Sequence, residues 1–589
     1  MAKINWKNSS GGDFAIGTNW STGTVPVSSS IANINATGTY TVTSSADETV
    51  LAITTAPTAT LDVTEGDFTA LAGTGVGANA GTISVETGSK FIVGGTVKNS
   101  GTISVNGSDG NAALVIARDT TLQGGGKVTL STQSSQIGGG GTLTNIDNVI
   151  SGSGAVYVAL VNENKGVIDA NQSGSLNFVG PVTNAGLLES TSTGGLVLPN
   201  GPISNSASGV IGAFGAGSTV SLNGTAVSGG TLETGNGGEI IVSSGDVTFN
   251  GSNGHALTNT GSVVVNPGYV LTLLGTIKNT GTIALQSNSY NTPAYIEIGP
   301  GGVTLAGSGN VTLSDSTGSN QNNIIGNGTS TTLTNQNTIS GAGEIGGNGL
   351  LLTNQGVIDA NGTNPLIVDT GASAVTNSGT LEATSNGELF VASNVTNTGH
   401  LIANNGTAIF AGAVSGTGTA TVQGAGSIEF GSTTTANTTF AAGADGTVTF
   451  DAASKLTGTN SITGFKLGDT IDLADINYSG SGPTLAFNSG VLTVSDGTDT
   501  AKIKMIGSFT LASFHAAPDG SGGTLITDPP APKKTTPPTS PPSLDRVASL
   551  FAQSMAASFP DEHGTPVTNG GSSQTVANNE QFLAQPHHG

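Results

Sequence analysis

The chain of 589 residues contains no cysteine, and only 9% of its residues are charged and 4% aromatic. The absence of cysteine excludes disulfides, thiolate nucleophiles and cysteine-ligated metals, and it suits a protein that works outside the cytoplasm without redox assistance. An average soluble protein has about 25% charged residues. This composition therefore argues against an ordinary globular enzyme.

Basic residues and long apolar runs are also scarce. The chain has 15 Lys and Arg against 37 Asp and Glu, a net charge of -22 and a pI near 4.3. No basic surface can therefore form to neutralise phosphates, which excludes nucleic acid as a partner. No run of 18 apolar residues exists, so no transmembrane segment is expected. The first residues, MAKINWKN, lead into polar residues rather than an apolar stretch, so we expect no Sec signal peptide.

Glycine is abundant, with 92 residues, and much of it occurs in a recurring phrase, Asn-x-Gly followed by alternating apolar residues. Neighbouring copies often lie 20 residues apart, as Asn79 and Asn99 do, and this interval matches one coil of a solenoid. The phrase begins at Asn79, Asn99, Asn164, Asn184, Asn259, Asn279, Asn354, Asn377 and Asn397.

The residues of one coil predict short strands. Segments such as 102–105 (TISV) alternate with period 2 and carry β-branched side chains, while Gly, Asn, Asp and Ser between them favour tight turns. We expect an all-β fold, a right-handed parallel β-helix of about 20 residues per coil, in which the recurring asparagines form a hydrogen-bonded ladder down one corner. A sandwich or propeller is the alternative, but a propeller blade needs about 40 residues.

A longer period divides the chain into domains. Residues 77–105 align with 257–285 at a shift of 180, and GVIDAN at 166 returns at 356. We therefore predict two tandem cassettes, at 66–245 and 246–446. Residues 1–65 contain Trp6 and Trp20, which are expected to cover the open edge of the first coil; the alternative is that an indole ring stacks on a sugar.

From residue 447 the pattern changes, and residues 447–528 are predicted to form a small C-terminal β-domain. Residues 464–476 (GFKLGDTIDLADI) resemble the segment that closes the C-terminal β-roll of type I secreted repeats-in-toxin proteins. The hairpins that follow resemble a small β-domain found near the end of many large secreted proteins of proteobacteria. The resemblance covers about 80 residues and implies export by type I machinery.

Calcium binding is one interpretation of this segment. It lacks the GGxGxDxUx nonapeptide whose aspartates coordinate calcium in the repeats-in-toxin family. Asp469, Asp472 and Asp475 still offer the hard oxygen ligands that calcium requires. The alternative is that these carboxylates are solvated or cap turns, and no other cofactor is expected.

The last part of the chain differs from the rod. Residues 529–542 (PPAPKKTTPPTSPP) form a proline-rich linker that we expect to be extended. Residues 543–589 are predicted to contain a short helix followed by a flexible tail, which is where an uncleaved export signal would lie. Ser543 is the predicted N-cap of that helix. Its apolar face consists of Leu544, Val547, Leu550, Phe551 and Met555.

The repeated Asn-x-Gly-Thr-Ile motif over about residues 60–445 resembles the β-helical repeat secreted proteins of proteobacteria, such as autotransporter passengers and filamentous-haemagglutinin-like adhesins. Members of these families mostly act as adhesins or surface structures. The resemblance implies an extracellular or cell-surface location. It also implies partners among extracellular glycans, host or neighbouring cell surfaces, or further copies of the chain.

Parallel β-helices also include polysaccharide lyases and hydrolases, whose sites need clustered acids. Asp169 and Glu189 recur in the second cassette as Asp359 and Glu382, which fits a repeat feature better than a single active site. We therefore expect a non-enzymatic adhesin or extracellular matrix scaffold that acts through multivalent contacts. The alternatives are an S-layer-like self-assembling envelope protein and a polysaccharide-active enzyme.

Overall fold

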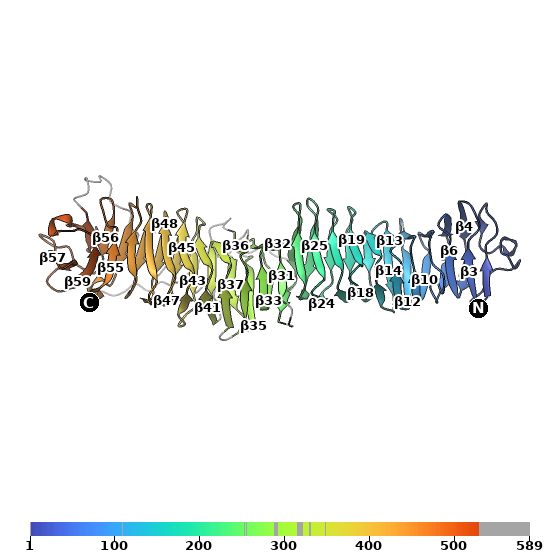
Figure 1. Cartoon of the computed structure of the whole chain (residues 1–589), viewed down its shortest axis with the longest axis horizontal. Coiled ribbons are helices and arrows are strands. Elements are labelled where there is room, and N and C mark those ends of the chain that lie inside the picture. Colours follow the sequence, from blue (N-terminus) through green and yellow to red (C-terminus); the bar gives the residue numbers. More distant parts are fainter. Residues whose placement is uncertain are drawn as a thin grey trace, which may run out of the picture.

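The computed structural model describes residues 2–528, except 109, 253, 255, 288–291, 315–321, 329–330 and 348. The chain winds into an all-β parallel β-solenoid of about 19 coils with about 22 residues each. At about 4.8 Å per coil the coils form a rod about 90 Å long (Figure 1). The predicted fold class is confirmed, with coils slightly longer than expected. The predicted linker at 529–542 and the helix and tail at 543–589 lie outside the described residues.

Each coil contributes strands to three parallel faces, which we call A, B and C in the order in which the chain passes through them. Two long strands bend from face A to face B, β10 (Lys90–Lys98) and β12 (Ala112–Gln123), and two bend from face B to face C, β33 (Val270–Asn279) and β35 (Ala294–Ala306).

The other strands of face A are β5 (Glu48–Val50), β8 (Asp67–Ala70), β14 (Ser135–Gly139), β17 (Gly154–Val156), β20 (Leu176–Phe178), β23 (Leu196–Leu198), β26 (Thr219–Asn223), β29 (Glu239–Ser244), β32 (Ser262–Val265), β34 (Thr282–Leu285), β36 (Asn310–Leu313), β39 (Thr338–Gly341), β42 (Val357–Ala360), β45 (Thr380–Thr384), β48 (His400–Asn404), β51 (Thr419–Gln423), β53 (Asn437–Phe440), β55 (Thr457–Thr463) and β59 (Thr500–Ile506).

At the N-terminal end of the rod, a separate three-stranded sheet lies in line with face B. It consists of β1 (Ala2–Asn5), β3 (Ser30–Ile34) and β6 (Ala52–Thr55). The further strands of face B are β15 (Leu143–Asn145), β18 (Leu160–Asn162), β21 (Val182–Asn184), β24 (Gly201–Asn205), β27 (Thr225–Ser228), β30 (Val247–Gly251), β37 (Asn322–Gly326), β40 (Gly343–Gly346), β43 (Leu366–Asp369), β46 (Glu388–Val391), β49 (Thr407–Phe410), β52 (Ser427–Phe430), β54 (Thr447–Phe450) and β56 (Thr470–Leu473).

Face C consists of β2 (Gly12–Asp13), β4 (Tyr40–Ser44), β7 (Ala59–Val63), β9 (Thr82–Glu86), β11 (Thr102–Asn106), β13 (Lys127–Leu130), β16 (Val149–Gly152), β19 (Val167–Ala170), β22 (Leu187–Ser190), β25 (Val210–Ala213), β28 (Thr231–Thr234), β31 (Leu257–Asn259), β38 (Thr331–Asn335), β41 (Leu350–Asn354), β44 (Val375–Asn377), β47 (Val395–Asn397) and β50 (Val414–Ser415). Short 3-10 helices, η1 (Gly17–Asn19), η2 (Ala453–Lys455) and η3 (Leu511–Ser513), interrupt the loops near the two ends.

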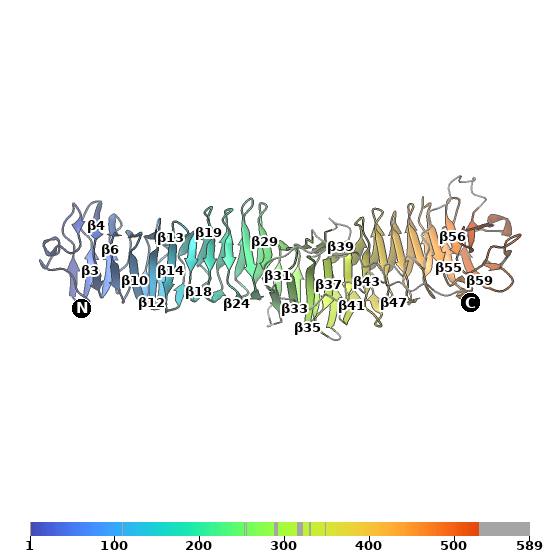
Figure 2. The ribbon, with the colours of Figure 1, turned by 180° about the vertical axis from the view of Figure 1, so that it is seen from behind.

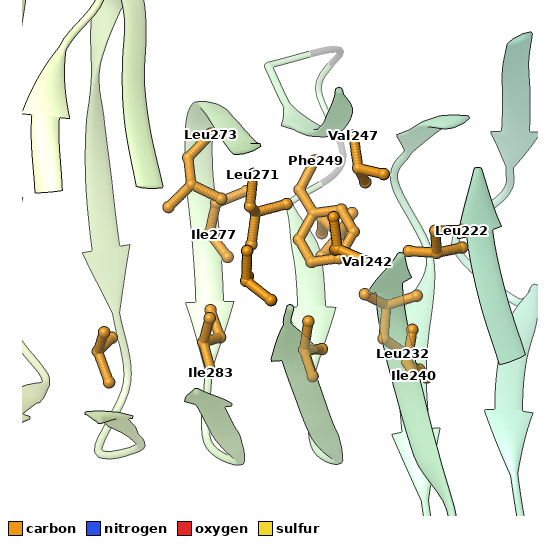
Figure 3. Packing of buried hydrophobic residues seen from close by; sticks show 14 of the residues in the cluster. Leu222, Leu232, Ile240, Val242, Val247, Phe249, Leu271, Leu273, Ile277 and Ile283 are labelled. Atoms are coloured by element: carbon orange, nitrogen blue, oxygen red, sulfur yellow. The ribbon is translucent and has the colours of Figure 1, made fainter. Parts of the chain in front are cut away.

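A single apolar core fills the interior of the rod. Because side chains alternate along a strand, every second residue points inward, and in the strands these are mostly Val, Ile and Leu. Figure 3 shows this packing near the middle of the rod, where Leu232, Val242, Phe249 and Leu271 all lie inside. The core therefore continues without a break from the first cassette into the second.

Aromatic side chains close the N-terminal end. Trp6 and Trp20 pack edge to face with ring centroids 5.0 Å apart, and Phe14 lies 4.8 Å from Trp20 and 5.1 Å from Phe68. Both indoles are buried, with exposed fractions of 1% and 0%, so neither offers a ring face to a sugar. The tryptophans therefore cover the first coil.

Antiparallel strands close the C-terminal end. The strands β54, β55 and β56 continue the coils beyond residue 447, and β57 (Thr484–Asn488), β58 (Val491–Ser495) and β59 then form an antiparallel sheet. A second hairpin, β60 (His515–Pro518) and β61 (Thr524–Thr527), pairs antiparallel with β56. The change of direction ends the parallel stack at the C-terminal end of the rod.

Buried asparagines form a ladder through most of the rod. The side-chain Nδ2 of Asn79 donates to Oδ1 of Asn99 at 2.7 Å, and Nδ2 of Asn377 donates in the same way to Asn397 at 2.7 Å. Each amide also donates to a nearby backbone carbonyl, as that of Asn79 does to Thr102. Eight of the predicted ladder residues occupy such buried corners: Asn79, Asn99, Asn184, Asn259, Asn279, Asn354, Asn377 and Asn397.

The ninth predicted ladder residue, Asn164, does not belong to the ladder, because it is exposed. The turn in that coil is longer, so Asn162 takes the buried position and donates to Gly166 and to Asn184. Asparagines outside the Asn-x-Gly context complete the ladder and were missed from the sequence. They are Asn145, Asn148, Asn162, Asn205, Asn335 and Asn337, and four of them end a strand, a signal that could have found them.

The ladder changes corner in the middle of the rod. Up to Asn205 it follows the ends of face B strands and lies between faces B and C. From Asn259 it follows the ends of face C strands and lies between faces C and A. Seven strands, β25 to β31, separate these two asparagines, which is two full coils and one additional strand.

The second cassette is therefore rotated about the rod axis by one face relative to the first. The corner glycines follow the same rule: Gly95 lies between faces A and B, and Gly275 between faces B and C, each with a φ of +69°. A residue with a side chain adopts this φ at a cost, so both bends require glycine. Figures 1 and 2 show the outline of the rod shift sideways near β31.

Replacing a ladder asparagine should destabilise the rod. Asn377→Ala removes the side-chain hydrogen bonds to Asn354 and Asn397 and those to the carbonyls of Gly379 and His400, and we expect a loss of about 1 to 3 kcal/mol in the free energy of unfolding. The exposed Asn164→Ala should change it by less than about 0.5 kcal/mol. Denaturant titration followed by circular dichroism measures both, and equal losses would contradict the ladder.

Candidate functional site

Two equivalent columns of outward-facing polar residues run along the rod. On face C, Thr129, Ser151, Asp169 and Glu189 lie side by side in register, each on the next coil. We call this set column 1. On face A, Thr312, Ser340, Asp359 and Glu382 form the same order of residue types, and we call this set column 2. The two columns are copies carried by the two cassettes.

The aspartate of each column accepts hydrogen bonds from the same two types of side chain, a threonine and an asparagine. In column 1, Asp169 accepts hydrogen bonds from Thr191 Oγ1 at 2.7 Å and from Asn171 Nδ2 at 3.0 Å. In column 2, Asp359 accepts them from Thr384 Oγ1 at 2.9 Å and from Asn361 Nδ2 at 3.0 Å. Both carboxylates are therefore oriented in the same way on their faces.

Burial and a neighbouring aspartate raise the proton affinity of the glutamate in each column. Partial burial and the neighbouring Asp169 raise the pKa of Glu189 to about 7. Burial and Asp359 likewise raise the pKa of Glu382, and burial raises that of Asp359 itself. Column 1 can therefore both donate and accept hydrogen bonds near neutral pH, which suits contact with a hydroxyl-rich ligand.

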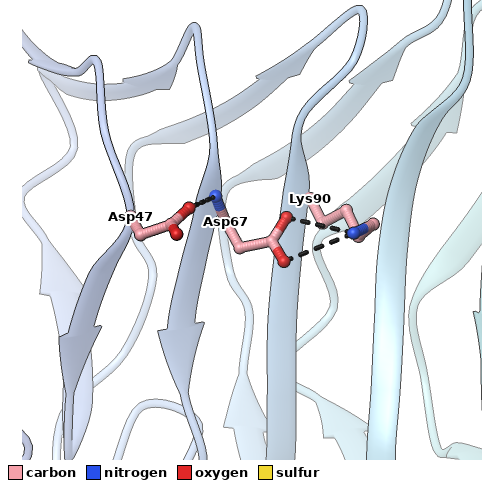
Figure 4. A network of polar contacts seen from close by, with 3 residues as sticks. All are labelled: Asp47, Asp67 and Lys90. Atoms are coloured by element: carbon pink, nitrogen blue, oxygen red, sulfur yellow. Dashed lines mark hydrogen bonds and ion pairs between the residues drawn. The ribbon is translucent and has the colours of Figure 1, made fainter.

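Positive charge does little to balance these acids. Between described side chains, the one ion pair joins Lys90 Nζ and Asp67 at 3.3 Å, far from both columns along the chain. Figure 4 shows it on the outer surface, where Asp47 also accepts a hydrogen bond from the backbone N–H of Asp67 at 2.8 Å. An exposed pair of this kind contributes about 0 to 1 kcal/mol.

The rotation between the cassettes decides where the columns point. Column 1 lies on face C and column 2 on face A, although their residues correspond one to one. Equivalent surfaces of the two halves therefore face different directions. Sequence comparison identified Asp169, Glu189, Asp359 and Glu382 as recurring residues, and the structure places them in two columns rather than in one cluster.

The three aspartates considered for calcium do not converge. Asp469 accepts a hydrogen bond from the backbone N–H of Lys466 at 3.0 Å, and Asp475 accepts two from Ser454. Asp472 points outward from β56 instead. Only Asp472 lies within β56, whereas Asp469 precedes the strand and Asp475 follows it, and each of these two is held by its own turn contacts. In the described part of the chain, no group of three His, Cys, Asp or Glu side chains could hold a metal ion.

Burial gives two of these aspartates unusual protonation behaviour. It raises the pKa of Asp469 to about 6, and burial together with Asp519 and Asp451 raises that of Asp472 to about 7. Asp475 and Asp469 act as turn caps, since their partners are backbone N–H groups and a hydroxyl. The contacts of Asp469 and Asp475 therefore agree with the alternative interpretation, in which these carboxylates cap turns.

Comparisons with known proteins give no family. No protein-family model matches the chain, and no curated protein matches its sequence. Among the residues that the structure describes, no helix is long and apolar enough to cross a membrane.

The raised pKa of Glu189 predicts how stability depends on pH. The folded pKa of about 7 exceeds the ordinary value of 4.5, so the folded protein binds the proton more tightly between these values. Stability is therefore expected to fall as pH rises from about 5 to 7 and then to level off. Thermal unfolding of Glu189→Gln should depend less on pH and give a higher midpoint than wild type at pH 8.

The exposed Glu239, on face A, provides a matched control for this measurement. Glu239→Gln should keep the pH dependence of the wild type. If Glu189→Gln and Glu239→Gln have the same profile, the stacking of Glu189 on Asp169 is not responsible.

Proposed function

We propose that the protein is an extracellular or cell-surface β-solenoid without enzymatic activity, which acts as an adhesin or matrix scaffold through many weak contacts. The observation that carries this proposal is the duplicated polar column, which occurs on face C in one cassette and on face A in the next. A single active site would not need two copies. A binding surface gains from each copy.

The geometry favours a partner that is itself repetitive and polar. Neighbouring coils place hydroxyls and carboxylates about 4.8 Å apart, a spacing close to that of groups along an extended polymer. Extracellular glycans offer hydroxyls at such intervals. Because the two columns face different directions, one rod can contact two partners, and we propose that it bridges a glycan layer and a neighbouring surface.

We propose export by type I machinery to the outside of a bacterium. The support is the resemblance of residues 464–476 to the closing segment of repeats-in-toxin proteins, together with the absence of cysteine. The closed ends of the rod favour discrete rods over end-to-end filaments. An S-layer-like assembly would have to form through the sides of the rod instead.

One observation favours a second candidate, a polysaccharide hydrolase. Asp169 and Glu189 lie on adjacent strands, and the raised pKa of Glu189 resembles that of a general acid. Retaining glycosidases place their two carboxyl groups about 5 Å apart, close to the strand spacing. The same pair in column 2 would then be a second active site.

The proposal predicts the effect of removing the columns. Variants Asp169→Ala/Glu189→Ala and Asp359→Ala/Glu382→Ala should each weaken retention on polysaccharide-coated beads and on cells. The combined variant should lose about 100-fold or more, because multivalent avidity exceeds single-site affinity by this order. Thr183→Ala/Thr376→Ala, which changes two exposed threonines outside the columns, should bind like wild type.

Other outcomes of the same assays would contradict the proposal. Release of reducing ends or unsaturated oligosaccharides, lost in the column variants, would indicate an enzyme. Ordered two-dimensional arrays on cells would indicate an S-layer-like protein. Fractionation of the native host with and without its type I exporter tests the location, and protein that stays cytosolic in both would contradict export.

A further inference from the structure

Face A of the second cassette carries opposite charges at two places. Column 2 contributes the outward-facing Asp359 on β42 and Glu382 on β45. Six strands after β42 in the same parallel stack, β59 carries Lys502 and Lys504, which are exposed and alternate with buried residues. We call these two residues the lysine pair. One linear surface therefore has an acidic end and a basic end.

An uncharged row joins the two ends. It leads from Glu382 through one outward residue on each following strand, in register. These residues are Ile402, Thr421, Thr439, Thr463 and Ile506. Lys504 lies two residues before Ile506 on the same side of β59, about 7 Å from the row and within reach of a lysine side chain. The acids and the lysine pair therefore follow one line along the rod, with about 24 Å between β45 and β59.

The lysine pair has no acidic partner among the described side chains. The outward neighbours of the two lysines on β55 and β58 are uncharged: Thr457, Ser461, Val491 and Thr493. Neither lysine forms an ion pair with another described side chain. The chain has a net charge of -22 and only 15 basic residues, so an exposed basic site is an exception on its surface. An acidic group from outside the rod is therefore well suited to the lysine pair.

A second copy of the chain offers such acids at the right place. The strand β51 is the third after β42 and the third before β59. If two rods meet face A to face A and run in opposite directions, a twofold axis near β51 places column 2 of each rod over the lysine pair of the other. Each rod gives and receives the same contact, as an isologous interface requires.

The opposite orientation is disfavoured by the same charges. In a parallel pair of rods, equivalent strands would face each other, so that Glu382 would meet Glu382 and Lys504 would meet Lys504. Like charges across an interface cost free energy, whereas the antiparallel pair replaces them with opposite charges. The charge pattern therefore selects one orientation.

We propose that two copies of the chain pair in antiparallel orientation through face A of their second cassettes, with the lysine pair of each rod bound to Asp359 and Glu382 of the other. This goes beyond the proposed function, because column 2 then meets a second rod while column 1 on face C stays uncovered. A dimer would present two copies of column 1 to a glycan, which raises avidity.

The area of the overlap predicts a reversible dimer. Seven strands of four to seven residues, β42 to β59, cover about 34 by 16 Å on each rod. The two faces together bury about 1,100 Å², which is typical of weak interfaces. Because only the C-terminal part of each rod overlaps, the dimer should be about 150 Å long, against about 90 Å for one rod.

Sedimentation of the full-length chain tests the pairing by reversing charges. Lys502→Glu/Lys504→Glu makes the face wholly acidic, and Asp359→Lys/Glu382→Lys makes it wholly basic. Each variant alone should dimerise about tenfold more weakly than the wild type, or less still, because like charges then meet. An equimolar mixture of the two variants should form a heterodimer, and added salt should weaken both this heterodimer and the wild-type dimer.

A matched control has the same change of charge elsewhere. Lys98→Glu/Lys127→Glu reverses two exposed lysines on faces B and C of the first cassette, and this variant should dimerise like the wild type. Circular dichroism checks that every variant keeps its strands. A wild type that stays monomeric at every concentration, or a Lys502→Glu/Lys504→Glu variant that dimerises as well as the wild type, would overturn the proposal.

Electron microscopy of the same samples tests the orientation. Wild-type dimers should measure about 150 Å, and dimers of about 90 Å would overturn the antiparallel, partly overlapping arrangement. A monomeric wild type that is retained on a polyuronate gel through the lysine pair would show an acidic glycan as the partner and would also overturn the proposal. Sedimentation and microscopy involve no glycan, so their outcome is distinguishable from failure of the proposed function.

Discussion

Parallel stacking of coils in register determines every other property of this rod. Each strand hydrogen-bonds to the equivalent strand of the next coil, so each side chain lies beside its counterpart at about 4.8 Å. Inward positions become continuous rows of Val, Ile and Leu, and corner asparagines become a ladder. Outward positions become columns, among them the two polar columns. Equivalent outward residues of successive coils therefore form lines that run along the rod.

The same constraint explains how the second cassette can be rotated. All three faces bury the same kinds of side chain with the same alternation, so a strand from one face fits on another. One additional strand between Asn205 and Asn259 therefore moves every later corner by one face while the core continues through Leu232, Val242 and Phe249. The rotation costs no apolar burial and gives duplicated surfaces two directions.

Period and turn chemistry made the solenoid predictable from the sequence, but the position of each corner was not predictable. The turn after Asn162 is longer than that after Asn184, and this difference alone displaces Asn164 from the ladder. The rotation of the second cassette could not be predicted from the sequence, because the strands of the three faces have the same pattern of residues. Whether Asp469, Asp472 and Asp475 converge could not be predicted from the sequence, because it depends on the turns before and after β56. The continuous apolar runs LIV at 366–368 and LFV at 389–391 lie in strands whose residues are buried on both sides, a feature that was not predicted.

In-register stacking also accounts for the low charge of the chain. A charged residue repeated on every coil would meet a like charge at about 4.8 Å, which costs about 1 kcal/mol in water and more where partly buried. Burial is the main cause of the raised pKa values of Glu189 and Glu382, and the neighbouring aspartate adds to each shift, which reflects this cost. Columns of Thr, Ser and Asn avoid it, because hydroxyls and amides can donate to their own copies, as Ser104 and Thr129 hydrogen-bond at 3.0 Å. Uncharged polar side chains can therefore repeat on successive coils of an in-register rod at a lower electrostatic cost than carboxylates can.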